Sequence, residues 1–273
     1  GQTLDQAPAS TVPTRLRLLN GRVPVQSPEL VHSCELVVTY RAELIARRLV
    51  EGAPTESPSI PVGKLTPIER QAYTRTSAHY DFRSPEFQRW LKQHDLMRRA
   101  EERDLALAYR VFRHIVGAYR YNYSANQDRR ASRLCRTDRT DCGGLAILWA
   151  ASLRANGVPA RVLFGRWANS GARLTDDVGT AHSKAECFVE GVGWVPVDPS
   201  SALSDPRGAD RHFGDDPGDF LALHIDPDLT IDSGRFGRRP IHWLQGTLHW
   251  VVGQGSSTPN TQTISWTVVG VEK

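Results

Sequence analysis

The segment from Asp141 to Gly157 constrains the fold more than any other, because it carries both a start signal and a stop signal for a helix. Aspartate is a preferred residue before the first helical turn, and glycine is typical of the position after the last turn. Between them, apolar residues recur three and four positions apart, which predicts one buried stripe. The members of this stripe are Leu145, Leu148, Trp149 and Leu153. We therefore predict a core helix here.

A cysteine, Cys142, stands at the first position of this helix. Unsatisfied backbone N–H groups and the helix dipole favour an anion at that end, so the position favours the thiolate form. Gly143 and Gly144 add no side-chain bulk, and a substrate carbonyl could therefore approach the sulfur. The competing interpretation is a small buried hydrophobic residue, which is what most free cysteines are.

Two strands are predicted downstream, at His182–Val189 and Trp194–Asp198, with a turn between them. His182 and Asp198 have the same parity relative to the turn, so their side chains are expected on one face, within about one ladder step. Asp198 could then accept a hydrogen bond from one imidazole nitrogen and leave the other facing the Cys142 thiol. A histidine and a carboxylate in this arrangement, with a cysteine at a helix start, indicate nucleophilic catalysis.

Other elements flank these. Ser84 is predicted to cap a helix that begins with Pro85, and Asp104 to cap a second helix that ends near Gly117. Further strands are predicted at Arg15–Leu19, Cys34–Tyr40, Val158–Phe164, Thr247–Val252 and Thr263–Val269. These elements indicate an α+β protein. The predicted organisation is an N-terminal β-containing extension (1–83), a catalytic core (84–205) and a C-terminal segment (206–273) that completes the core sheet or packs on it.

Several sequence blocks occur in an order and spacing that resemble the transglutaminase-like superfamily. They are Asp141-Cys-Gly-Gly-Leu-Ala, Arg154-Ala-Asn-Gly-Val-Pro-Ala-Arg161, the segment His182–Val189, and Gly193-Trp-Val-Pro-Val-Asp-Pro199. The resemblance extends over about residues 85–205. It implies a papain-like α+β fold in which the nucleophile lies at a helix N-terminus packed on an antiparallel sheet.

By this resemblance Cys142 is the nucleophile, His182 the general base and acid, and Asp198 the carboxylate that orients the imidazole. The backbone N–H of Cys142 is expected to be one oxyanion donor. Tyr121 is the candidate for the second and Tyr123 the reserve, with core packing as their competing role.

Two positions depart from the pattern. Thr140 stands where many members have glycine, and Lys184 where many have an aromatic residue. The first could alter the loop that leads into the helix. We expect the second, together with Gly143, to bear on substrate access.

The implied function is attack of the Cys142 thiolate on a protein or peptide amide, which leaves a thioester. Water would complete hydrolysis and an amine would complete a crosslink; the resemblance slightly favours hydrolysis. Two alternatives are a non-catalytic binding module and an arylamine N-acetyltransferase. The intact triad weighs against the first, and the neighbourhood of the cysteine against the second.

No cofactor or metal is expected. Asp226, Asp228 and Asp232 lack the glycine and final glutamate of a calcium loop, so a solvated turn is favoured. His242 and His249 are interpreted as strand or core residues without metal-ligand spacing. Cys135 is interpreted as a loop thiol in preference to a redox partner of Cys142, and Cys34 and Cys187 as buried thiols.

Composition excludes some classes of protein. The chain has 34 basic and 30 acidic residues, a net charge of +4 that supports no strong claim of nucleic-acid binding. No apolar run approaches the ~18 residues of a membrane span. Because the chain begins at Gly1 and not with Met, we expect upstream sequence to have been removed; if an export signal was part of it, the protein is exported, and otherwise it is cytoplasmic. The compartment, periplasmic, secreted or cytoplasmic, and the oligomeric state stay open.

Overall fold

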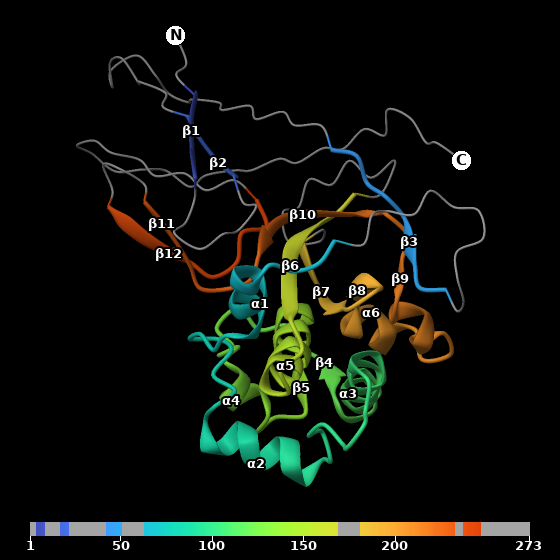
Figure 1. Ribbon diagram of the computed structural model, residues 1–273. Helices are drawn as coiled ribbons and strands as arrows, with labels where there is room; N and C mark the ends of the chain where they lie inside the picture. Colours follow the sequence, from blue (N-terminus) through green and yellow to red (C-terminus); the bar gives the residue numbers. More distant parts are fainter. Residues whose placement is uncertain are drawn as a thin grey trace.

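The centre of the computed structural model is a four-stranded sheet in the order β10–β6–β7–β8, with every neighbouring pair antiparallel (Figure 1). The structure describes residues 4–8, 17–21, 42–50, 63–168, 181–232 and 237–246. The sheet strands are β6 (Ala160–Trp167), β7 (Ala181–Val189), β8 (Gly193–Val197) and β10 (Phe220–Ile225). The predicted hairpin of β7 and β8 is confirmed, and Ala185 pairs with Val197 in it.

The predicted core helix is α5 (Cys142–Ala155), with Asp141 as its N-cap. Every residue from Gly143 to Arg154 is buried, so the helix is covered all round and not along one stripe. Strands β6 and β7 cover one side, and helices α3 (Asp104–Ala118) and α4 (Ala131–Leu134) pack elsewhere around it (Figure 1). A helix rich in Ala and Leu on every face is stable only in such surroundings.

Of the three helix starts predicted from capping residues, those at Ser84 and Asp141 are confirmed and the one at Asp104 is not. Helix α2 (Pro85–Gln93) is capped by Ser84, whose Oγ accepts a hydrogen bond from the backbone N–H of Phe87 at 3.3 Å. Asp104 was predicted to cap α3, and this is wrong: it is the first helical residue. Its carboxylate instead accepts a hydrogen bond from Arg98 Nη2 at 2.6 Å.

The remaining elements are short. The helical ones are α1 (Pro67–Thr74), α6 (Pro199–Ser204) and the 3-10 turn η1 (Ala209–His212). The paired strands are β1 (Leu4–Pro8) with β2 (Arg17–Gly21), β3 (Arg47–Arg48) with β9 (Asp215–Asp216), β4 (Arg120–Tyr121) with β5 (Arg139–Thr140), and β11 (Leu229–Asp232) with β12 (Arg238–Ile241). Strand β2 lies two residues beyond the predicted Arg15–Leu19. The predicted strands at 34–40, 247–252 and 263–269 lie outside the described residues.

One hydrophobic core joins segments from both sides of the predicted catalytic region. Tyr80 and Phe82 pack in the same cluster as α3, α5 and the sheet, and so does Ala209. Strand β10 extends the sheet by pairing with β6. The domain boundaries at 83 and 205 stay predictions. Among the described residues, no helix has both the length and the apolar character required to cross a membrane.

Candidate active site

The N-terminus of α5 presents Cys142 at its first position, partly exposed. Asp141 keeps an extended backbone, and its Oδ1 accepts a hydrogen bond from the N–H of Gly144 at 2.9 Å. This bond satisfies one of the donors that a helix start leaves unpaired. The cap therefore fixes the turn on which the thiol stands.

Strand β5 leads directly into this turn and brings a tyrosine to it. Tyr121 on β4 pairs in parallel with Thr140, and the N–H of Asn122 donates to the Thr140 carbonyl at 2.9 Å. As a result the Tyr121 phenol lies next to the Cys142 side chain. Burial, followed by the nearby charges of Cys142 and Asp141, raises the pKa of Tyr121 to about 12. The phenol therefore keeps its proton at neutral pH and can donate it. Tyr123 is exposed.

His182 and Asp198 meet across the hairpin as the sequence parity predicts. The Nε2 atom of His182 lies 2.8 Å from Asp198 Oδ2, and both side chains are buried. The Cys142 side chain lies close to the imidazole as well and contributes to its electrostatic environment. Because Nε2 is engaged by Asp198, Nδ1 is the ring nitrogen available to the thiol. The structure thus brings Cys142, His182 and Asp198 together.

The carboxylate of Asp198 is held by two serines that sequence analysis did not single out. Asp198 is the N-cap of α6, and its Oδ1 accepts from the N–H of Ser201 at 2.9 Å and from Ser200 Oγ at 3.1 Å. Its Oδ2 accepts from Ser201 Oγ at 2.8 Å. The sequence does carry a signal for this helix cap, because an aspartate followed by a proline, here Asp198-Pro199, is typical of a helix start. These bonds fix the orientation of the carboxylate.

The buried pair shifts both of its own pKa values. Burial alone would lower the pKa of His182, but the Asp198 carboxylate and the Cys142 side chain outweigh it and raise that pKa to about 9. Burial likewise opposes ionisation of Asp198, but His182 and the Ser201 hydrogen bonds hold the pKa of Asp198 well below its usual range. The imidazole is therefore protonated, and the carboxylate charged, near neutral pH.

This shift predicts how stability depends on pH. Unfolded histidine loses its proton near pH 6.5, whereas folded His182 keeps it to about pH 9. Between these values the folded state binds more protons, so stability present below pH 6.5 is lost as the pH rises to about 9. We expect a decline of up to about 1.4 kcal/mol per pH unit in that window. Urea unfolding should show it in the wild type and not in His182→Gln; equal slopes would contradict it.

Two aromatic side chains pack against His182, and a lysine in turn packs against them. The Trp167 ring stacks on the imidazole at 4.3 Å between centroids, and Phe220 packs edge-on at 6.0 Å. Lys184 is 4% exposed, and its Nζ lies 3.4 Å from Asp216 Oδ1 and 4.6 Å from the Trp167 centroid. Lys184 is therefore a buried ion-pair partner, and the aromatic ring that stacks on His182 is that of Trp167.

An arginine missed by sequence analysis completes the helix start. Arg129 Nε lies 3.0 Å from both carboxylate oxygens of Asp141, and Nη2 also donates to Oδ2. Both side chains are buried. The negative charges of Asp141 and Cys142 help to raise the pKa of Arg129 above its ordinary value although burial opposes this. The sequence signal was weak, because Arg129 stands in an arginine-rich loop and resembles its exposed neighbours.

The two glycines after Cys142 have different roles. Gly143 is buried, and a Cβ there would meet Asp141 Oδ1 at 3.6 Å and Ser183 Oγ at 3.7 Å, which are ordinary contacts. A Cβ at Gly144 would lie 1.9 Å from Thr140 Oγ1. Thr140, the departure noted in the sequence, thus occupies the space that Gly144 leaves.

We expect Gly144→Ala to lower the free energy of unfolding by about 2 kcal/mol, because the new methyl group overpacks against Thr140. Gly143→Ala is the matched control and should be neutral or stabilising by up to about 1 kcal/mol, since alanine favours helix. Urea titration of both variants measures the difference. The cost of Gly144→Ala should shrink in a Thr140→Gly background; an undiminished cost would contradict the contact.

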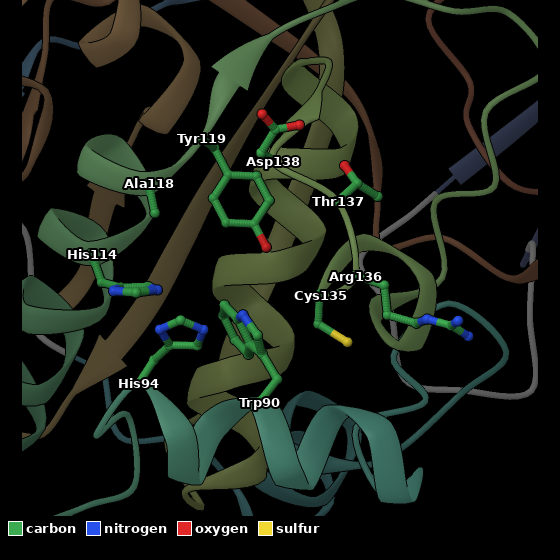
Figure 2. A pocket seen from close by; sticks show the side chains of 9 residues that line it. All are labelled: Trp90, His94, His114, Ala118, Tyr119, Cys135, Arg136, Thr137 and Asp138. Atoms are coloured by element: carbon green, nitrogen blue, oxygen red, sulfur yellow. The ribbon is translucent and has the colours of Figure 1, made fainter.

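Cys135 and Cys187 lie apart from this arrangement. Cys135 is a free thiol in a surface cavity of about 470 Å³, shown in Figure 2, and burial raises its pKa to about 11. The lining residues are Trp90, His94, His114, Ala118, Tyr119, Cys135, Arg136, Thr137 and Asp138, with no triad member among them. Cys187 is a buried free thiol, as expected. No disulfide joins Cys135 to Cys142; Cys34 lies outside the described residues.

Part of the chain matches a known protein family. Residues 93–199 match the model of the transglutaminase-like superfamily. This region belongs to that superfamily. The match supports a cysteine-type enzyme at the level of the family, and the α+β fold with an antiparallel sheet is transglutaminase-like and papain-like. No curated protein matches the chain.

Three solved structures are similar to this chain. A candidate cysteine protease from Cytophaga hutchinsonii is 14% identical with a TM-score of 0.41, over 62% of this chain and 49% of that one. The periplasmic domain of TgpA from Pseudomonas aeruginosa is 22% identical with a TM-score of 0.39, over 54% and 52%. A candidate protease from Parabacteroides distasonis is 10% identical with a TM-score of 0.33, over 57% and 35%. The chain spans about half the length of the first two structures.

Proposed function

We propose that the protein is a cysteine-dependent acyl-transfer enzyme that attacks protein or peptide amides through a thioester on Cys142. The observation that carries this proposal is the His182 imidazole, whose Nε2 lies 2.8 Å from Asp198 Oδ2 and which has the Cys142 side chain close by. A thiol, a base and an orienting carboxylate in this order form a nucleophilic triad. The raised pKa of His182 favours an imidazolium that can balance a thiolate.

The chemistry proceeds in two stages. The Cys142 thiolate attacks the amide carbonyl carbon, and the carbonyl oxygen becomes an oxyanion. Protonated His182 then gives its proton to the leaving nitrogen as the carbon–nitrogen bond breaks, so an amine departs and a thioester remains. In the second stage His182 removes a proton from water, the hydroxide attacks the thioester, and the thiolate returns. We propose hydrolysis of this kind; an amine in place of water would give a crosslink.

Tyr121 is the side chain proposed to stabilise the oxyanion together with the backbone N–H of Cys142. Its phenol reaches the sulfur, and its raised pKa keeps the proton available. We expect Tyr121→Phe to lower kcat about 100-fold with little change in KM, because only the transition state carries the oxyanion. Tyr123→Phe is the matched control two residues away. Similar losses in both variants would contradict the assignment of Tyr121.

The reaction class is tested with two substrates in parallel. An unfolded protein is incubated with the enzyme and analysed for cleaved peptide bonds by mass spectrometry. A glutamine-containing peptide with and without a primary amine is analysed for deamidation and amine incorporation. Products that disappear in Cys142→Ala support an acyl-transfer enzyme, and cleavage without amine incorporation supports hydrolysis. Absence of every product and of any acylated Cys142 would overturn the proposal.

A further inference from the structure

Three side chains of metal-binding type meet outside the triad: His79, Asp228 and His242. One candidate ligand atom from each lies within 4.8 Å of the other two. The Nδ1 atom of His79 is 2.6 Å, and that of His242 3.2 Å, from the same Asp228 Oδ1. The cluster differs from the turn expected at Asp226–Asp232, because Asp228 is largely buried and not solvated.

The other carboxylate oxygen of Asp228 is held in place by the protein. Its Oδ2 accepts hydrogen bonds from Ser77 Oγ at 2.7 Å and from the backbone N–H of His79 at 2.8 Å. This leaves Oδ1 directed at the two imidazoles. Metal-binding carboxylates are commonly oriented by such second contacts.

The nearby Asp226 provides a contrast. Its Oδ1 accepts from Tyr80 and from the backbone N–H of Val162, and its Oδ2 accepts from Arg154 Nη2 at 2.7 Å. Both oxygens are therefore engaged in holding α5 against β6 and the turn after β10. Asp226 is an anchor of the fold, whereas Oδ1 of Asp228 faces the imidazoles of His79 and His242.

The donor set selects the kind of ion. Two imidazole nitrogens and one carboxylate oxygen suit Zn²⁺ and related divalent transition ions, whereas Ca²⁺ and Mg²⁺ require six or more oxygens. In tetrahedral zinc sites, bonds of about 2.0–2.1 Å place ligand atoms roughly 3.3 Å apart. The distances of 2.6 and 3.2 Å here need only small side-chain movements to reach that value. The His242 side chain is 45% exposed, so water can complete the coordination.

We propose that His79, Asp228 and His242 form a binding site for a divalent transition metal ion of the Zn²⁺ type, which fastens residues 242–246 to the body of the protein. This segment borders the candidate active site: the Trp243 ring lies 5.2 Å from the Arg129 guanidinium carbon, and Gln245 Nε2 donates to the His182 carbonyl at 2.8 Å. The ion would therefore order the flank of the site without taking part in its chemistry.

Metal binding is tested with Zn²⁺ itself, by calorimetric titration of the chelator-treated full chain. All proteins carry Cys142→Ala, so that the catalytic thiol and His182 cannot take up the ion together. We expect one equivalent to bind, and Asp228→Asn and His242→Ala each to weaken binding at least tenfold. His212→Ala is the matched control, because His212 Nε2 likewise lies near a carboxylate, 3.3 Å from Asp205. Its affinity should equal that of the parent protein.

A second measurement keeps the proposal testable if Asp228→Asn fails to fold. Zn²⁺ should raise the Tm of the parent protein and leave that of His242→Ala unchanged, since His242 is half exposed and its loss should not prevent folding. Substoichiometric binding, or equal affinity in the parent and His242→Ala proteins, would overturn the site. Because no readout involves catalysis, failure here is distinct from failure of the proposed function.

Discussion

His182→Ala is expected to lower acyl-transfer turnover by about 10²–10⁴-fold, the usual contribution of a general acid–base residue. The rate of Cys142 alkylation by iodoacetamide at pH 7 should fall about tenfold, because a free thiol is only a few per cent thiolate there. In the structure the imidazole contacts both the thiol and Asp198, so its removal takes away the base and the balancing charge together.

Mass spectrometry of the alkylated protein supplies an internal control. Burial raises the pKa of Cys135 to about 11, so this thiol should react slowly and equally in both proteins. His94→Ala removes an exposed histidine from the cavity of Figure 2 and should leave Cys142 alkylation unchanged. If Cys142 reacts equally fast with and without His182, the histidine does not activate the thiol and is not a catalytic residue.

Arg129→Met is expected to lower the free energy of unfolding by about 3–5 kcal/mol, the usual cost of leaving one member of a buried ion pair without its partner. Asp141 would keep the Gly144 hydrogen bond but lose the guanidinium that contacts both of its oxygens. Arg130→Met is the matched control. Arg130 pairs with Asp128 in a pair that is nearly half exposed, so its loss should cost at most about 1 kcal/mol.

Urea titration compares these variants directly. A double variant, Arg129→Met with Asp141→Asn, should recover part of the loss because no uncompensated charge remains. If Arg129→Met costs no more than Arg130→Met, the pair does not stabilise the helix start. The alkylation rate of Cys142 in folded Arg129→Met measures whether the reactivity of the thiol also depends on this arginine.

The elements nearest the candidate site could be predicted because their signals are local. Asp141 caps a helix within three residues of itself, and the alternation of His182–Val189 determines which face of the strand each side chain takes. The same two rules anticipated the meeting of His182 and Asp198. The start of α6 at Asp198 follows the same capping rule, although the sequence analysis predicts no helix there.

Burial of charged residues could not be predicted in this way. Lys184 is expected to bear on substrate access and Asp226 to lie in a solvated turn, yet Lys184 is buried beside Asp216, and Asp226 pairs with the buried Arg154. His79 and Asp228 are 149 positions apart, so no motif spacing relates them. Among the arginines, only packing distinguishes Arg129 from Arg130.

The amino-acid sequence by itself therefore determined three features. They are the core that resembles the transglutaminase-like superfamily, the helix start that carries Cys142, and the placement of His182 and Asp198 on one face of their hairpin. Caps and strand alternation depend on residues a few positions apart, which a single sequence displays. Only the tertiary structure decided that Tyr121 reaches the thiol, that Trp167 and not residue 184 covers the imidazole, and that two histidines share Asp228. Such contacts depend on which distant segments pack together, and this is settled by burial across the whole core.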